Sequence, residues 1–218
     1  MDDGSVRMSD QIGPAMPAFE AAFSAFSHGT LIATTRGQVA VEDLEPGMKL
    51  QTAEHGAQQI VWIGSMTLMP RTEDLPDNGN LTRIPADSYG MGRPERDLLC
   101  GPGARLLMRP VGMGARLDGE RALTPAARLA DGMNAIAVYP QRPVTVYHIC
   151  TRRHAVINAG GLSAETFHPG AGFERNMGPN MLSLFLSFFP HIKQPRDFGP
   201  LAHARLPLNE NDPASDLA

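Results

Sequence analysis

Cysteine is scarce in this chain, with two residues, Cys100 and Cys150, among 218. Each stands in an apolar run, so both are predicted to be buried free thiols, with a disulfide between neighbouring strands as the alternative. The spacings typical of metal sites, Cys-x-x-Cys and His-Glu-x-x-His, do not occur. The sequence therefore predicts no metal and no cofactor.

Long apolar runs are also missing. The strongest one, residues 181–189, is far shorter than the ~20 residues that a membrane span requires. The opening Met-Asp-Asp-Gly-Ser is acidic and lacks the apolar core of a signal peptide. These features predict a soluble protein with no membrane partner, cytoplasmic by default, and they leave export without an N-terminal signal open.

Positive charge is too sparse for a nucleic-acid protein. Lys and Arg total 19 against 23 Asp and Glu, which gives a formal net charge of -4. The basic residues are scattered, and Arg152 with Arg153 is their densest pair. The sequence predicts no nucleic-acid partner. A protein partner stays open, because nothing in the sequence names one.

Glycine and proline, by contrast, are abundant, at 22 and 19 residues. They separate short β-branched runs, and this pattern is typical of strands joined by tight turns. We predict a flexible leader over residues 1–24, a β domain over 25–172 and a helical appendage with a disordered end over 173–218. Strands are expected at 30–34, after Gly37, after Gly47, and at 58–64, 81–85, 97–100, 105–108, 135–138, 144–150 and 154–157. Helical segments are expected at 19–23, 124–130 and 180–189, and a loop at 70–80 with a turn at Asn78 and Gly79.

Several motifs of the β region occur together in an order known from one family. The pattern Phe-x-x-Gly-Thr-x-Ile-x-Thr-x-x-Gly starts at Phe26, and Val-Glu-Asp-Leu-x-x-Gly starts at Val41. Trp62-Ile63-Gly64 and the run at residues 161–167, Gly-Leu-x-Ala-Glu-Thr-Phe, follow. In these motifs, which span about residues 25–190, the chain resembles the bacterial branch of the Hint (Hedgehog/intein) domains. The resemblance implies a mainly β fold, a horseshoe of short strands with a short C-terminal helical appendage.

The resemblance also implies a reaction, an intramolecular acyl shift. In the family, a Cys at the first position of the domain attacks the preceding carbonyl and forms a thioester. A Thr/Ser-x-x-His element polarises that carbonyl and protonates the leaving amide, and a closing block with Asn resolves the thioester. This chemistry needs a nucleophile, an acid near neutral pKa and a positioned peptide bond.

The chain departs from the family pattern at each reacting position. Ala25 stands where the nucleophile is expected, and Gly101 and Ala104 stand where the hydroxyl and imidazole are expected. Gly160 replaces the Asn of the closing block. We therefore predict a catalytically degenerate domain.

Three neighbouring groups are residual candidates for chemistry. Ser24 and Ser27 flank Ala25, but a nucleophile moved by one or two residues changes strand face or shifts by several ångströms. His154 keeps its family position, and with His148 it is a candidate acid–base or metal group. The interpretation we favour for His154 is a hydrogen-bonded core or turn histidine.

Three hypotheses about function follow. The favoured one is a Hint-fold binding or structural module without self-cleavage. The second is residual autoprocessing through Ser24 or Ser27. The third is an accessory of exported proteins, which the absence of Gly-Gly-x-Gly-x-Asp repeats disfavours.

Overall fold

Short antiparallel strands dominate the computed structural model, which describes residues 9–70, 80–109 and 121–207. The predicted mainly β class is confirmed. The predicted turn at Asn78 and Gly79 and the disordered end of the chain lie outside the described residues. The strands are β1 (Phe26–Ser27), β2 (Leu31–Thr34), β3 (Gly37–Ala40), β4 (Lys49–Thr52), β5 (Gly56–Leu68), β6 (Leu81–Ile84), β7 (Leu98–Cys100), β8 (Arg105–Met108), β9 (Ala122–Pro125), β10 (Ile136–Val138), β11 (Val144–Thr151), β12 (Val156–Ala159) and β13 (Leu162–Glu165).

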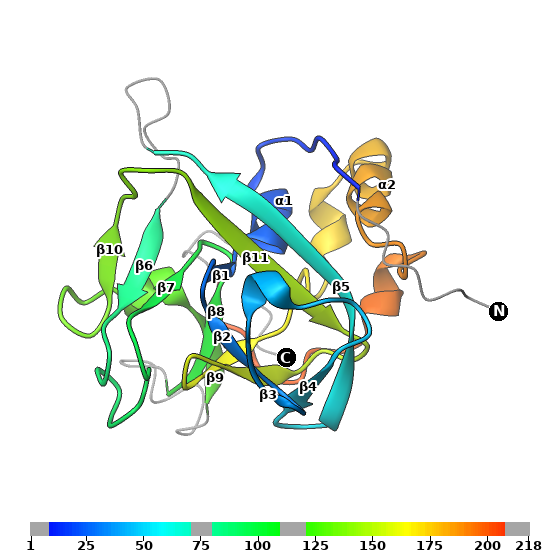
Figure 1. The fold of residues 1–218 in the computed structure, drawn as a ribbon. Helices are drawn as coiled ribbons and strands as arrows, with labels where there is room; N and C mark the ends of the chain where they lie inside the picture. Colours follow the sequence, from blue (N-terminus) through cyan, green and yellow to red (C-terminus); the bar gives the residue numbers. More distant parts are fainter. Residues whose placement is uncertain (1–8, 71–79, 110–120, 208–218) are drawn as a thin grey trace.

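Two long strands, β5 and β11, run through the middle of the sheet (Figure 1). Side chains of β5 alternate between the two faces, so Ile60, Trp62 and Leu68 are buried while intervening residues are more exposed. Twelve strands of the described chain follow one path, β10-β6-β7-β1-β11-β5-β4-β2-β12-β13-β8-β9, and β3 pairs with β2. Because β4 and β11 both pair with β5, this strand connects the two halves of the sheet.

The two-residue strand β1 has a central position despite its length. Phe26 pairs with Tyr147 of β11 on one side and with Cys100 of β7 on the other. As a result, the residues just before β1 lie against the loop that follows β7. That junction holds most of the positions that the sequence singled out.

Helices α1 (Pro17–Phe23) and α2 (Pro179–Ser187) lie beside each other against one side of β5 and β11 (Figure 1). Phe19 of α1 meets Phe185 and Phe188 edge to face, with ring centroids 5.2 and 5.7 Å apart. Each such buried ring contributes about 1.5–3 kcal/mol. The end of the predicted flexible leader is thus a helix fixed by aromatic contacts, because Phe19 is 3% exposed. The helical turn expected at residues 19–23 is confirmed.

The C-terminal region is more closely integrated than an appendage. Beyond α2 and the 3₁₀ turns η3 (Phe173–Asn176) and η4 (Pro195–Phe198), the chain returns to the sheet. Leu123 of β9 donates its N–H to Ala204 O at 2.8 Å and accepts the N–H of Leu206 at 3.0 Å. Residues 204–206 therefore pair with the sheet edge at β9 through the bridge between Leu123 and Arg205.

One predicted helix is wrong. Residues 124–130 were expected to be helical because Thr124 and Pro125 have the form of a cap and first helical residue. Instead β9 continues through Pro125 and only the 3₁₀ turn η2 (Ala126–Leu129) follows. Pairing of Thr124 with Leu106 in β8 overrides the local helix signal.

Candidate autoprocessing site

The structure brings Ser24 and Ala25 against the loop of residues 101–104. Gly101 donates its N–H to Ala25 O at 2.8 Å, and Gly103 donates its N–H to Ser24 O at 2.9 Å. Ala25 donates its own N–H to Tyr147 O at 3.0 Å. The positions where the resemblance predicts the nucleophile and the Thr/Ser-x-x-His element are therefore neighbours, and we call this region the glycine junction.

The glycines of the junction leave no room for side chains. A Cβ atom at Gly101 would lie 2.2 Å from Ser24 O, and one at Gly103 would lie 2.3 Å from Ala21 O. Both contacts are with backbone atoms, which cannot move aside as a flexible side chain can. A hydroxyl-bearing residue therefore does not fit at position 101 in this backbone.

Alanine at positions 25 and 104 completes an apolar environment. Ala25 and Ala104 are 0% and 1% exposed and belong to the main hydrophobic core. Phe26, Cys100 and Leu106 are members of the same core. The peptide bond between Ser24 and Ala25 is thus enclosed by apolar side chains and backbone, with neither nucleophile nor acid at the two alanine positions.

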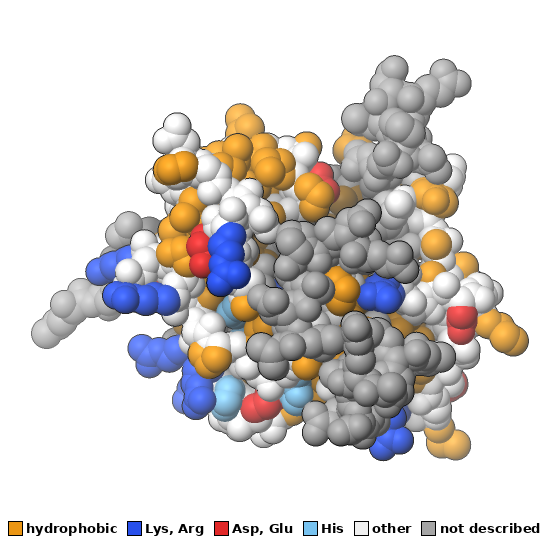
Figure 2. Space-filling view, turned by 180° about the vertical axis from the view of Figure 1, so that it is seen from behind, with side chains coloured by type: hydrophobic (Ala, Val, Ile, Leu, Met, Phe, Trp, Pro, Cys, Tyr) orange, Lys and Arg blue, Asp and Glu red, His pale blue; other side chains and the backbone are white. Residues whose placement is uncertain are grey.

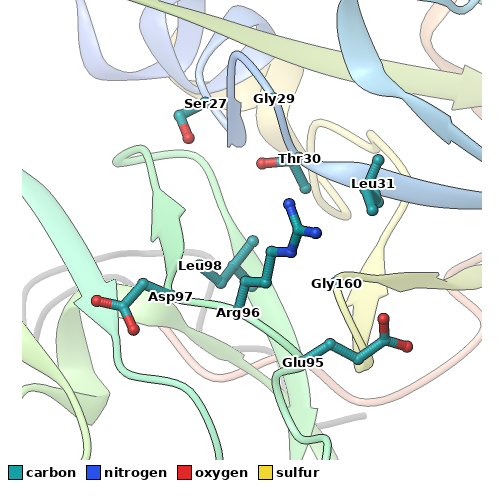
Figure 3. A pocket seen from close by; sticks show the side chains of 9 residues that line it. All are labelled: Ser27, Gly29, Thr30, Leu31, Glu95, Arg96, Asp97, Leu98 and Gly160. Atoms are coloured by element: carbon teal, nitrogen blue, oxygen red, sulfur yellow. The ribbon is translucent and has the colours of Figure 1, made fainter.

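Ser24 and Ser27 lie in different surroundings. Ser24 is 0% exposed, and its Oγ accepts the Gly103 N–H at 3.1 Å. Ser27 instead lines a small cavity, together with Gly160 (Figure 3). The two residual nucleophile candidates therefore do not share a site.

Gly160 has a left-handed backbone, with φ 58°, and hydrogen bonds to Leu31 and Glu95. A Cβ there would make only an ordinary contact, 3.6 Å from Leu98 Cδ1. Asn is the residue after Gly that best tolerates this conformation. The absence of Asn is therefore not imposed by space, unlike the absence of a side chain at Gly101.

His154 is a hydrogen-bonded core residue. Its Nδ1 accepts the Ala202 N–H at 2.8 Å, so in the neutral ring the proton is on Nε2, which donates to Glu165 Oε1 at 2.9 Å. The side chains of both His154 and Glu165 are 0% exposed. The described contacts of His154 include none with Ala25 or the loop at residues 101–104, so it is not brought to the junction by any direct contact.

Glu165 is the centre of a buried charge network that also includes His154, His168 and Arg205. Arg205 donates to Glu165 through Nε at 2.8 Å and Nη2 at 2.9 Å, and Nη2 also donates to His168 O at 2.6 Å. Burial alone raises the pKa of Glu165, but Arg205 and then His154 outweigh it and hold that pKa well below its usual range. Burial lowers the pKa of His168 to about 3. The network is therefore a stable ion pair with neutral histidine beside it.

The sequence interpretation missed Glu165, His168 and Arg205 as a group. In the sequence Glu165 is one residue of the motif at 161–167, and nothing there indicates that it forms a buried ion pair. Arg205 stands in an irregular segment with no pattern, and nothing local signals that its guanidinium is buried.

His148 is buried beneath α1. Its Nδ1–H donates to Ala21 O at 2.9 Å, and its Nε2 has no hydrogen-bond partner among the described residues. Burial lowers its pKa to about 4. The described residues contain no group of three His, Cys, Asp or Glu side chains that could hold a metal.

The cysteines are free and buried, as predicted. Burial raises the pKa of both Cys100 and Cys150 to about 12. Thiolate chemistry at neutral pH is therefore disfavoured at both. Within the described segments, no helix combines the length and the apolar character that crossing a bilayer requires.

The fold is a mainly β domain in which the residues before β1 lie against the loop that follows β7. A family model described as Hint domain matches residues 24–171, more than half of the chain. The chain belongs to this Hint domain family. No curated protein sequence matches it.

Several solved structures are similar in fold. An intein-like domain from Clostridium thermocellum is 14% identical, covering 66% of this chain and 99% of its own, with a TM-score of 0.45. The gp41-1 intein is 10% identical, with coverage of 66% and 98% and a TM-score of 0.42. A DnaB intein from Synechocystis sp. PCC 6803 is 11% identical, with coverage of 66% and 99% and a TM-score of 0.42.

Proposed function

We propose that this Hint domain does not cleave its own chain and acts as a binding module. The observation that carries the proposal is the glycine junction, where Ser24 O lies against Gly101 and Gly103 and both alanines are sealed in the core. An acyl shift needs a nucleophilic atom beside the Ser24 carbonyl, and Ala25 has none. It also needs an acid for the leaving amide, and Ala104 cannot serve as one.

One element of the reaction geometry persists. The Gly103 N–H donates to Ser24 O, and a backbone donor in that place can stabilise charge developing on a carbonyl oxygen. Without nucleophile and acid, this donor serves to join the loop to the chain before β1. The junction thus has a structural use in the absence of a reaction.

A protein partner suits this domain better than a nucleic acid. Figure 2 shows that most basic side chains visible on the described part of the reverse face lie toward its left side, where acidic, His and apolar side chains separate them. The net charge of -4 agrees with this distribution. A polyanion would need a continuous basic surface.

Intact-mass spectrometry tests the loss of self-cleavage. The purified chain, incubated with dithiothreitol or hydroxylamine, is expected to keep its full mass. Loss of the segment before Ser24, Ala25 or Ser27 would refute the proposal. Ala25→Cys combined with Ala104→His measures whether the scaffold still supports thioester formation when two reacting groups return.

Residual autoprocessing through Ser24 or Ser27 is the competing function. Ser24 is disfavoured because its buried Oγ accepts from Gly103 and no described base contacts it. Ser27 is the better candidate of the two, because it lines a cavity. Should cleavage occur, Ser24→Ala and Ser27→Ala in the same assay identify the nucleophile by which variant keeps its full mass.

A further inference from the structure

A small open cavity lies between the β1–β2 turn and the segment of residues 95–98, with Gly160 at its rim (Figure 3). It encloses about 410 Å³ of space, its open mouth included. The cavity is separate from the glycine junction, because neither Ala25 nor the loop at residues 101–104 lines it. Apart from Ser27, the residual nucleophile candidate, its polar groups have no part in the acyl-shift chemistry described above.

Two hydroxyl groups on one wall lack partners. Ser27 and Thr30 are 7% and 6% exposed, and their side chains form no hydrogen bond with any described residue. Both line the cavity. Neither oxygen is among the fully buried side-chain atoms without a partner in the described residues, so both hydroxyls are open to solvent through the cavity. A ligand bound in the cavity would take the place of water at both hydroxyls.

Arg96 provides a positive charge facing that wall. Figure 3 shows its guanidinium directed toward Thr30 from the opposite segment. Within the described residues Arg96 has no ion pair or side-chain hydrogen bond. Its acidic neighbours are engaged elsewhere: Glu95 accepts from Gln38 Nε2 at 3.2 Å, and Asp97 accepts from Ala86 N–H at 2.9 Å. Arg96 is thus left available to an external anion.

We propose that this cavity binds a carboxylate group on a short aliphatic stem. The guanidinium matches a carboxylate with two parallel N–H donors, and the Ser27 and Thr30 hydroxyls add further donors. Leu31 and Leu98, which also line the cavity, offer an apolar wall to the stem. The inference names the ligand chemistry of the proposed binding module, and so rests on that function.

The charge balance favours a carboxylate over a phosphate. Arg96 is the one cation among the residues that line the cavity, while Glu95 and Asp97 line it as well. A dianionic phosphate would be repelled by the two carboxylates and could satisfy only part of its charge. The single negative charge of a carboxylate is balanced by the one guanidinium, with no unpaired negative charge left over.

Amide NMR of the full chain tests the site. The probes are sodium propionate, sodium phosphate, and the paired peptides acetyl-Gly-Glu-Gly-amide and acetyl-Gly-Gln-Gly-amide. Propionate or the Glu peptide is expected to shift the Gly29, Thr30 and Gly160 amides saturably, whereas the Gln peptide does not. Arg96→Gln should weaken affinity about tenfold or more, the size expected for loss of a charged hydrogen-bond pair. Arg196→Gln, at an exposed arginine away from the cavity, is the matched control and leaves affinity unchanged.

The arms also separate the sources of the carboxylate. If only the Glu peptide gives saturable shifts, the bound carboxylate belongs to a polypeptide. If propionate gives them, a carboxylate on a short stem is sufficient for binding. Absence of saturable shifts, equal shifts in Arg96→Gln, or tighter binding of phosphate would overturn the inference. The intact mass of the same sample is recorded afterwards. A shortened chain would refute the non-cleaving function while leaving the carboxylate site standing.

Discussion

Two buried regions of this domain, the glycine junction and the charge network, differ in their content of polar side chains. At the junction, Ala25, Gly101 and Ala104 carry no polar side-chain atoms, and the polar backbone atoms there bond to one another. In the network, Glu165 and Arg205 keep full charges away from water and satisfy them with two direct hydrogen bonds. The domain thus carries its buried charge in the network of Glu165 and Arg205, and none on the side chains of Ala25, Gly101 and Ala104.

The difference shows which polar groups serve architecture. Arg205 comes from the segment that returns after α2, and its pairing with Glu165 joins that segment to β13. A buried ion pair adds little net stability compared with an apolar alternative, but breaking it leaves an uncompensated charge. The junction needs no buried ion pair, because hydrogen bonds between close-packed backbone segments hold it together. The following experiments test whether the two regions differ in this way.

Arg205→Ala should have the largest effect. It leaves the Glu165 carboxylate buried without its guanidinium, a loss of about 3–5 kcal/mol in the free energy of unfolding. Urea denaturation measures it. Arg196→Ala, an exposed arginine in η4, is the control and should cost under about 0.5 kcal/mol. A loss below about 1 kcal/mol for Arg205→Ala would show that the network does not hold the C-terminal segment.

Acid should destabilise the domain through its buried neutral histidines. The pKa values of His148 and His168 fall from 6.5 to about 4 and about 3 on folding, so the unfolded chain binds more protons between these values. Stability is therefore full above pH 6.5 and falls as the pH decreases from 6.5 toward the folded pKa values, by on the order of 2 kcal/mol per histidine near pH 4.5.

Urea midpoints measured from pH 7 to pH 4.5 check this dependence. His148→Leu should flatten the profile, because it removes one of the two titrating groups. His28→Gln, at an exposed histidine, should leave the profile unchanged. A flat profile in the unmodified chain would contradict the burial of both rings.

Gly101→Ala should cost about 2 kcal/mol, because its Cβ would overlap Ser24 O and force the backbone apart. Thermal unfolding gives the change in midpoint. Gly178→Ala is the matched control, since a Cβ there meets nothing within 4 Å, and it should cost less than about 1 kcal/mol. Equal effects of the two substitutions would show that the junction is looser than described.

Ser24→Ala should have the smallest effect, about 1 kcal/mol, because the Gly103 N–H keeps its bond to Ser24 O when the Oγ acceptor is lost. The same thermal measurement checks it, and the intact mass should not change. A much larger loss of stability would show that the Ser24 hydroxyl, rather than the backbone hydrogen bonds, holds the junction together.

Strand positions were largely predictable because β-branched runs between turn residues fix them locally. Val144 to Cys150, Gln58 to Gly64 and the α2 region all follow such local patterns. The segment at Thr124 failed, since its helix signal was weaker than pairing with β8. Cap and propensity rules weigh only neighbouring residues, so they cannot include a strand that is distant in sequence.

The candidate site was predictable only in part. The family motifs pointed to Ala25, Gly101, Ala104 and Gly160, and the structure brings the first three together. It keeps Gly160 at the Ser27 cavity and joins His154 to Glu165. The cavity itself, with Arg96 opposite Ser27 and Thr30, had no local signal, because Arg96 comes from a segment that is distant in sequence from the one that carries both hydroxyls.

Residue identity and order are enough to indicate the mainly β class and the Hint family, and they predict the loss of reacting groups at Ala25, Gly101 and Ala104. The need for glycine at position 101 follows from the folded chain alone, because a Cβ there would lie 2.2 Å from Ser24 O. The tertiary structure also sets the burial of Arg205 and the availability of Arg96. Charge and space at a buried position are set by neighbours distant in the chain, and folding alone brings those neighbours into contact.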